Sequence, residues 1–103
     1  MIRVVIKNNT ISVIGHANYA DYGKDIVCAS VSSVIGTVVN CIMNIDRDSI
    51  AYCDDGKTVS ISLISNNEVV EKIFITMIDI LKDLEKQYKE NIKIESEEWK
   101  CYF

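Results

Sequence analysis

The sequence of 103 residues contains no proline, only four glycines and a single histidine. Without proline, turns must be built from Asn, Asp and Gly, which tolerate unusual backbone conformations. The four cysteines form no CxxC pair, and one histidine cannot complete a Cys/His zinc set. We therefore expect free thiols in a reducing compartment, no metal and no cofactor.

A basic cluster is also missing, and the formal net charge is −4. Binding to a nucleic-acid backbone needs cations that displace counterions, so direct nucleic-acid binding is not expected. We find neither a signal-peptide pattern nor an unbroken apolar run approaching the ~18 to 20 residues that a spanning helix needs. The expectation is a cytoplasmic protein with no membrane association.

Hydrophobic residues make up 49% of the chain, enough to bury a core without disulfides or metal. The length is near the commonest domain size, so residues 1–103 are expected to form a single domain. The tail, residues 96–103, is acidic and then aromatic, with Trp99, Cys101 and Phe103 alternating. It either extends a strand or packs on a neighbour as an appendage.

Five segments have strand-like patterns of apolar and polar residues, and two longer segments have helical spacing. Asn8-Asn9 and Asp55-Gly56 are typical of tight hairpin turns. Asp25 is expected to be the N-cap of the first helix, and Ser65 with Glu68 to form a capping box for the second. The expected elements are strands at 2–7, 10–16, 48–53, 57–64 and 92–95, and helices at 26–44 and 69–89.

This order, strand-strand-helix-strand-strand-helix-strand, predicts an α+β fold, an α/β sandwich with a mostly antiparallel sheet. The two helices lie either on one face of the sheet or one on each face. The second helix carries a continuous apolar stripe that should face the core. That stripe consists of Val70, Ile73, Phe74, Met77, Leu81, Leu84 and Tyr88.

The only histidine, His16, ends a strand-like run, and Cys28 follows twelve positions later in the expected first turn of a helix. A thiol attacks only as thiolate, and its pKa is lowered by a helix N-terminus or a nearby imidazolium. His16 could take the thiol proton and later protonate a leaving amine. Asp25 could orient His16 or cap the helix, and Ser32 shares a helix face with Cys28.

The other candidates have simpler interpretations. Cys41 is expected to fill the helix core, Cys53 to lie on or beside a strand, and Cys101 to lie in the tail. Asp54 and Asp55 are interpreted as turn residues rather than a pair of catalytic carboxylates.

The strings Gly15-His16-Ala17, Tyr22-Gly23, Asp25-Ile26-Val27-Cys28-Ala29 and Val31-Ser32 resemble the signature of the Prp family of ribosomal-processing cysteine proteases. The resemblance extends over roughly residues 1 to 95 in length and element order. It implies a small homodimeric α/β protein with His16 as base and Cys28 as nucleophile. It also implies site-supporting roles for Asp25 and Ser32.

By the same resemblance, residues 17–24, with Tyr22 and Gly23, form a flexible loop over the substrate. The implied substrate is the N-terminal extension of a bacterial large-subunit ribosomal protein, number twenty-seven, cleaved after an aromatic residue. Ser30 departs from the small apolar residue of many members, and the aromatic tail is longer than usual.

Two other functions remain open at this stage. One is a non-catalytic ribosome-associated binding module with the same fold, and the other is a redox-sensing thiol protein. The first helix carries many small residues, and these, with the apolar tail, favour a homodimer.

Overall fold

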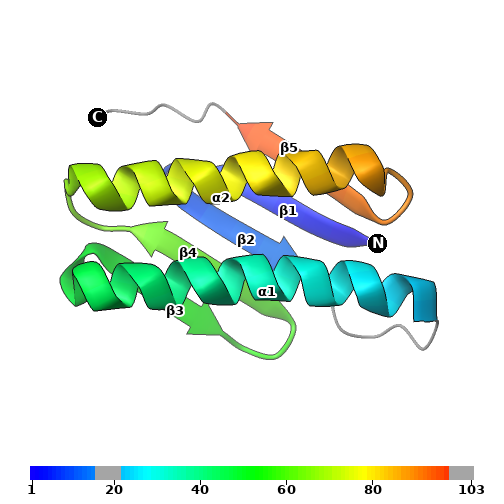
Figure 1. Cartoon of the computed structure of the whole chain (residues 1–103), viewed down its shortest axis with the longest axis horizontal. Helices are drawn as coiled ribbons and strands as arrows, with labels where there is room; N and C mark the ends of the chain where they lie inside the picture. Colours follow the sequence, from blue (N-terminus) through cyan, green and yellow to red (C-terminus); the bar gives the residue numbers. More distant parts are fainter. Residues whose placement is uncertain (16–21, 98–103) are drawn as a thin grey trace.

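The computed structural model describes residues 1–15 and 22–97, and the side chains of residues 22–25 and 97 are not described. Its elements follow the predicted order (Figure 1). They are β1 (Ile2–Lys7), β2 (Thr10–Ile14), α1 (Tyr22–Ile45), the 3-10 turn η1 (Arg47–Ser49), β3 (Ile50–Asp54), β4 (Thr58–Leu63), α2 (Glu68–Gln87) and β5 (Ile92–Glu97).

The five strands form one sheet in the order β3-β4-β2-β1-β5. Three neighbouring pairs are antiparallel, and β5 runs parallel to β1 at one edge. The last strand extends through Glu97, so it includes two residues that we assigned to the tail. The predicted α+β class and the mostly antiparallel sheet are confirmed.

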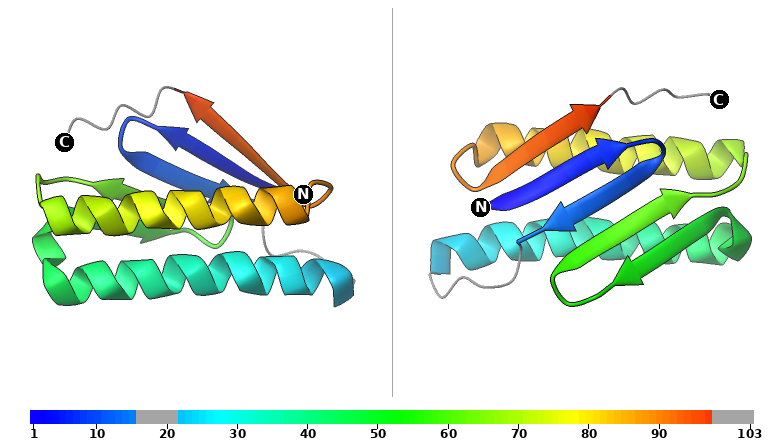
Figure 2. Two further views of the ribbon diagram at one scale, coloured as in Figure 1. Left: turned by 45° about the horizontal axis from the view of Figure 1, so that its top comes forward. Right: turned by 180° about the vertical axis from the view of Figure 1, so that it is seen from behind.

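Both helices cover the same face of the sheet, which decides between the two arrangements left open by the sequence (Figure 2). The buried core lies between the helices and this face. The expected stripe of α2 points into it, because Val70, Phe74, Met77 and Leu81 are fully buried. From the sheet the core receives Ile2, Val4, Ile6, Ile11, Val13, Ile50, Val59, Ile61, Leu63 and Ile92.

No described helix covers the other face of the sheet, and this face is largely polar. Thr10 and Ser62 lie opposite each other on β2 and β4, with their hydroxyl oxygens 2.9 Å apart. The polar positions of the alternating pattern in 58–63 face this side, and its apolar positions face the helices.

Turn and cap residues follow the expected chemistry in part. Asn8 and Asn9 both have positive φ, as the predicted Asn-Asn turn requires, and Gly56 has φ +88° in the second hairpin. The capping box is wrong. Asn67 is the N-cap of α2, and its side-chain oxygen accepts hydrogen bonds from the backbone N–H groups of Val69 and Val70.

The third strand begins later than predicted, because Asp48 lies in η1 and not in β3. Its neighbour Asp46 caps that turn by accepting a hydrogen bond from Asp48 N. Local side-chain bonding of this kind competes with strand formation at Asp residues.

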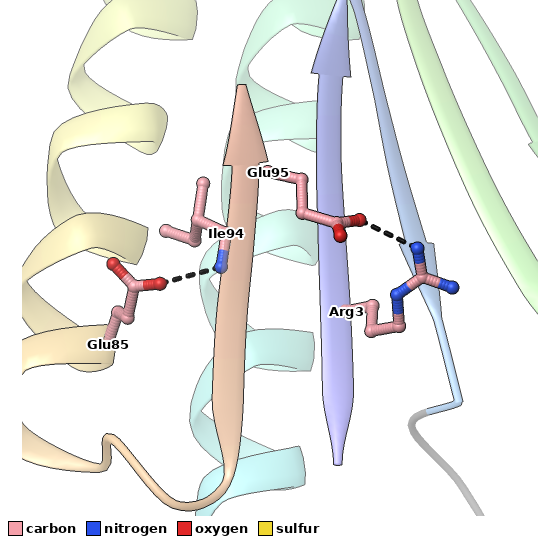
Figure 3. A network of polar contacts seen from close by, with 4 residues as sticks. All are labelled: Arg3, Glu85, Ile94 and Glu95. Carbon is pink, nitrogen blue, oxygen red and sulfur yellow. Dashed lines mark hydrogen bonds and ion pairs between the residues drawn. The ribbon is translucent and has the colours of Figure 1, made fainter. Parts of the chain in front are cut away.

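Two polar contacts hold β5 in place (Figure 3). Arg3 on β1 forms an ion pair with Glu95 on β5, with 2.7 Å between Nη2 and Oε2. On the other side of the strand, Glu85 of α2 accepts a hydrogen bond from the backbone N–H of Ile94 at 2.6 Å. The β5 edge is thereby tied to both its neighbours.

Helix α1 departs from the prediction in its start and its hydropathy. It begins at Tyr22, so Asp25 lies inside the helix and is not its N-cap. Contrary to our expectation, its segment Ile26–Ile45 is long and apolar enough to cross a membrane. Ser, Thr and Asn interrupt the apolar residues of this segment, but they add no charge. This is weak support for a membrane span, since a core helix passes the same test.

Candidate active site

The structure places the predicted site residues unequally. His16 lies outside the described residues, as do residues 17–21 of the expected loop. Tyr22 and Gly23 were expected in that loop, but they open α1. Cys28 and Ser32 lie one turn apart on α1, as the spacing predicted.

The strand that leads to His16 ends in a constrained backbone. Gly15 follows β2 with φ +81°, a region that side-chain-bearing residues rarely adopt. A Cβ at this position would lie 3.0 Å from the carbonyl oxygen of Met1. Gly15 therefore allows the backbone of Met1 to approach closely.

Cys28 is half-buried and packs against the hydrophobic core. Because α1 begins at Tyr22, Cys28 lies in its second turn and not in the first, as we had predicted. Each residue advances the helix by about 1.5 Å, so Cys28 lies roughly 9 Å from the start of α1. The stabilisation of an anion by a helix N-terminus decays within the first turn, so this contribution to thiolate formation is smaller than the sequence suggested.

Ser30, a departure from the family pattern, lies on the same turn. Its hydroxyl donates a hydrogen bond to the carbonyl oxygen of Ile26 at 2.8 Å. The Ser30 hydroxyl therefore makes its hydrogen bond within the helix and needs no partner in the site.

A cavity of about 160 Å³ opens beside Ser32, between α1 and the β2, β3 and β4 strands. Its apolar walls come from three buried valines and Ile35, and its polar groups from Ser32, Tyr52 and Asp54. The complete lining is Val13, Val31, Ser32, Ile35, Tyr52, Asp54 and Val59. Since Val13 and Ser32 both belong to this lining, the end of β2 that leads to His16 lies near the part of α1 that carries Ser32.

Sequence reasoning missed Tyr52 and Asp54 as site candidates. Asp54 was interpreted as a turn residue, and its Oδ1 does accept a hydrogen bond from Gly56 N in the turn, but it also ends β3 and lines the cavity. Asp55 is a turn residue as well: its Oδ1 accepts hydrogen bonds from the backbone N–H groups of Lys57 and Thr58. These bonds, led by the one from Thr58, lower the pKa of the Asp55 carboxyl. The sequence contained one indication of this: Tyr52 and Asp54 are two positions apart, which puts both side chains on one face of a strand.

The remaining described cysteines do not line the cavity. Cys41 is exposed on α1, so its expected role in the helix core is wrong. Cys53 is exposed on β3, where the sequence placed it. Within residues 1–15 and 22–97, no group of three or more His, Cys, Asp and Glu side chains could hold a metal ion.

Comparisons with known proteins agree on one family. The family model described as "Cysteine protease Prp" matches residues 1–93. A Staphylococcus aureus protein named "Ribosomal processing cysteine protease Prp" is 40% identical over 83 residues, which are 78% of each chain. A Mycoplasma genitalium protein of the same name is 29% identical over 101 residues, covering 96% of this chain and 99% of its own.

Solved structures agree with the fold. The crystal structure of the essential S. aureus protease Prp in complex with a substrate peptide has a TM-score of 0.76 and 29% identity. The complex of that protease with a covalently linked product peptide has a TM-score of 0.72 and 30% identity. Each comparison covers 93% of this chain and 97% of the other. The resemblance drawn from the motif around Cys28 is confirmed.

Proposed function

We propose, because the chain belongs to the Prp family of cysteine proteases, that Cys28 is its nucleophile and His16 its general base. The observation that carries this proposal is the covalently linked product peptide of the S. aureus protease. A covalent link between enzyme and product is what a nucleophilic mechanism leads one to expect. In this chain Cys28 is the only described cysteine that is half-buried, and Ser32, one helical turn after it, lines the cavity.

In the proposed reaction His16 takes the proton of the Cys28 thiol, and the sulfur attacks the carbonyl carbon of the scissile peptide bond. The tetrahedral intermediate collapses when His16 returns the proton to the leaving amine. Water, activated by the same imidazole, then hydrolyses the thioester and frees Cys28. Backbone N–H groups near Cys28 are proposed to stabilise the oxyanion.

Other residues have supporting roles in this proposal. Asp25, three positions before Cys28 on α1, would orient His16, and Ser32 would donate a hydrogen bond within the site. Tyr22 and Gly23 would belong to the region that contacts the peptide as it enters.

The proposed substrate is the N-terminal extension of a bacterial large-subunit ribosomal protein, number twenty-seven. The relatives carry ribosomal processing in their names, and the S. aureus protease has been captured with a substrate peptide. The net charge of −4 on this chain suits a basic polypeptide partner. Cytoplasmic localisation and a single domain over the whole chain belong to the same proposal.

We also propose that the enzyme is a homodimer. The support is the outer face of α1, which carries no charged residue from Ile26 to Ile45 and exposes Ile26 at 59%. Depletion of charged residues is a feature of the centre of protein interfaces.

The test is cleavage of a peptide containing the extension, followed by mass spectrometry. Cys28→Ala should keep the fold and abolish cleavage, and Cys28→Ser should fail too, because a hydroxyl is far less acidic than a thiol. His16→Ala should lose most activity, with a residual rate that rises with pH as the unaided thiol ionises. Cys41→Ser and Cys53→Ser are matched controls that should cleave normally, since both side chains are exposed.

Two alternatives give different results. Undiminished cleavage by a folded Cys28→Ala protein would falsify the protease mechanism. Peptide binding without cleavage by the unmodified protein would favour the ribosome-associated binding module. Reversible oxidation of Cys28 by peroxide, without peptide cleavage, would favour the redox sensor.

A further inference from the structure

The β3 edge of the sheet lies next to the cavity, and no described strand covers it. Among residues 1–15 and 22–97, β3 is an end strand and pairs with β4 alone. Ser49 accepts a hydrogen bond from Ile64 N, and Asp55 donates one to Thr58 O, so the odd-numbered residues of this segment bond to β4. Because bonding alternates along an antiparallel pair, the backbone N–H and C=O groups of Tyr52 and Asp54 point to the open edge.

The opposite edge of the sheet is different. There the outward N–H of Ile94 on β5 is occupied by Glu85 from α2, as Figure 3 shows. A side chain that occupies an edge N–H discourages pairing with another strand. The β3 edge is therefore the better place for an additional strand.

The cavity beside this edge has the size of one side chain. Its volume of about 160 Å³ is close to that of apolar protein cavities that hold a benzene ring, on the order of 150 Å³. Val13, Val31, Ile35 and Val59 give it apolar walls. Tyr52 also lines the cavity and is 45% exposed, so this side of the lining reaches solvent.

Asp54 adds a charge to the same lining. Its side chain is exposed, and its Oδ1 accepts a hydrogen bond from Gly56 N at 2.9 Å. That single bond leaves most of the carboxylate's acceptor capacity available to a cation. Tyr52 and Asp54 alternate with Cys53, so both side chains project to the helix side of β3.

We infer that the substrate peptide binds as an extended strand on the β3 edge, with one apolar side chain in the cavity and a Lys or Arg side chain against Asp54. The inference rests on the proposed function and adds the specificity of the site. Backbone hydrogen bonds to an edge strand supply affinity, and pockets for alternate side chains supply selectivity.

The path from this subsite to the nucleophile is short. Ser32 lines the cavity, and Cys28 precedes it by one helical turn, about 5.4 Å. An extended chain covers about 3.3 Å per residue, so the side chain in the cavity belongs to a residue about two positions from the scissile bond. The basic side chain would lie within a few residues of it.

The first test measures binding, so that it does not depend on cleavage. Fluorescein-labelled peptides of the ribosomal extension carry Lys or Gln at each position in turn, and their Kd for the Cys28→Ala protein is measured by fluorescence anisotropy. At one position Lys should bind about 1.5- to five-fold more tightly than Gln, the range of an exposed ion pair. Asp54→Asn should abolish that preference, and the matched control Asp79→Asn, on α2, should preserve it.

The second test concerns the cavity. Val59→Ala enlarges it, so the ratio of kcat/KM for peptides with a naphthyl and a phenyl side chain at the cavity position should rise. Val70→Ala, an equally conservative change of a buried valine on α2, should leave that ratio unchanged. A ratio within one variant is insensitive to how much protein is folded.

The outcomes separate the two proposals. An unmodified protein that binds the peptides with the Asp54-dependent preference but cleaves none of them contradicts the proposed function and supports the subsite. Cleavage with an equal Lys preference in Asp54→Asn and wild type overturns the subsite and leaves the protease. Absence of peptide binding to Cys28→Ala also overturns the subsite.

Discussion

Gly15→Ala and Gly36→Ala make the same chemical change in two different backbone settings, and we expect opposite effects on stability. Gly15 has φ +81° and a potential Cβ position 3.0 Å from Met1 O. Gly36 lies inside α1, and a Cβ there would meet nothing within 4 Å. The pair therefore separates backbone strain from the general effect of replacing glycine.

The magnitudes follow from these settings. A left-handed conformation costs a residue with a Cβ about 1–2 kcal/mol, and the contact with Met1 O adds to that cost. The lower entropy of the unfolded alanine chain offsets about 0.4–1 kcal/mol. Gly15→Ala should thus lose about 1 kcal/mol of unfolding free energy. Gly36→Ala should gain about 0.5–1 kcal/mol, because glycine is unfavourable within a helix.

Urea unfolding at one fixed protein concentration measures both changes. For a domain of about this size, 1 kcal/mol corresponds to a shift in Tm of roughly 4 °C or more, so the two variants should move apart in a thermal scan as well. Equal shifts of the two variants in the same direction would contradict the strain argument.

A second measurement connects Gly15 to the proposed site. Gly15 directly precedes His16, so a strained backbone here should displace the proposed base. The alkylation rate of Cys28 by iodoacetamide near pH 7 should fall in Gly15→Ala and stay unchanged in Gly36→Ala. If Gly15→Ala is destabilised but the alkylation rate is unchanged in both variants, the backbone strain at Gly15 does not affect the proposed site.

Local sequence rules predicted the elements that are determined by neighbouring residues. The positive φ of Asn8 and Asn9 follows from the ability of Asn to adopt that conformation. The stripe from Val70 to Leu81 is buried as its spacing required, because α2 has charged residues on its other side.

The same rules failed where contacts between elements distant in the sequence determine the structure. Helix α1 has almost no charged residues, so no polar stripe marks its solvent face, and Cys41 was wrongly assigned to the core. Asp25 resembles an N-cap in the sequence, but the helix starts at Tyr22. The parallel pairing of β1 with β5 joins the two ends of the described chain, which no local pattern records.

The candidate site shows the same division. Cys28 and Ser32 were identified from a spacing on one helix, and the family signature assigned them roles. The cavity was not predictable, because its lining comes from four elements that are separate in the sequence. Tyr52 and Asp54 become candidates only when β3 is placed beside α1.

Two further predictions concern α2. Glu85→Ala removes the acceptor of Ile94 N, so urea unfolding should show a loss of about 1–2 kcal/mol in unfolding free energy. The exposed β5 edge should also promote concentration-dependent association, measured by sedimentation. Glu85→Gln keeps an acceptor and should lose less stability. Glu71 is only 4% exposed, and burial, reinforced by repulsion from Glu68, raises the pKa of its carboxyl above the ordinary 4.5. The folded state therefore holds this proton to higher pH than the unfolded state, and stability falls as pH rises through that interval. Glu71→Gln should be more stable than wild type at pH 7, and the difference in unfolding free energy should vanish below pH 4.5. The control variant Glu90→Gln, at an exposed position, should change stability little at either pH. A Glu71→Gln protein that is less stable than wild type at pH 7 would show that the charged carboxylate has a stabilising partner in the fold.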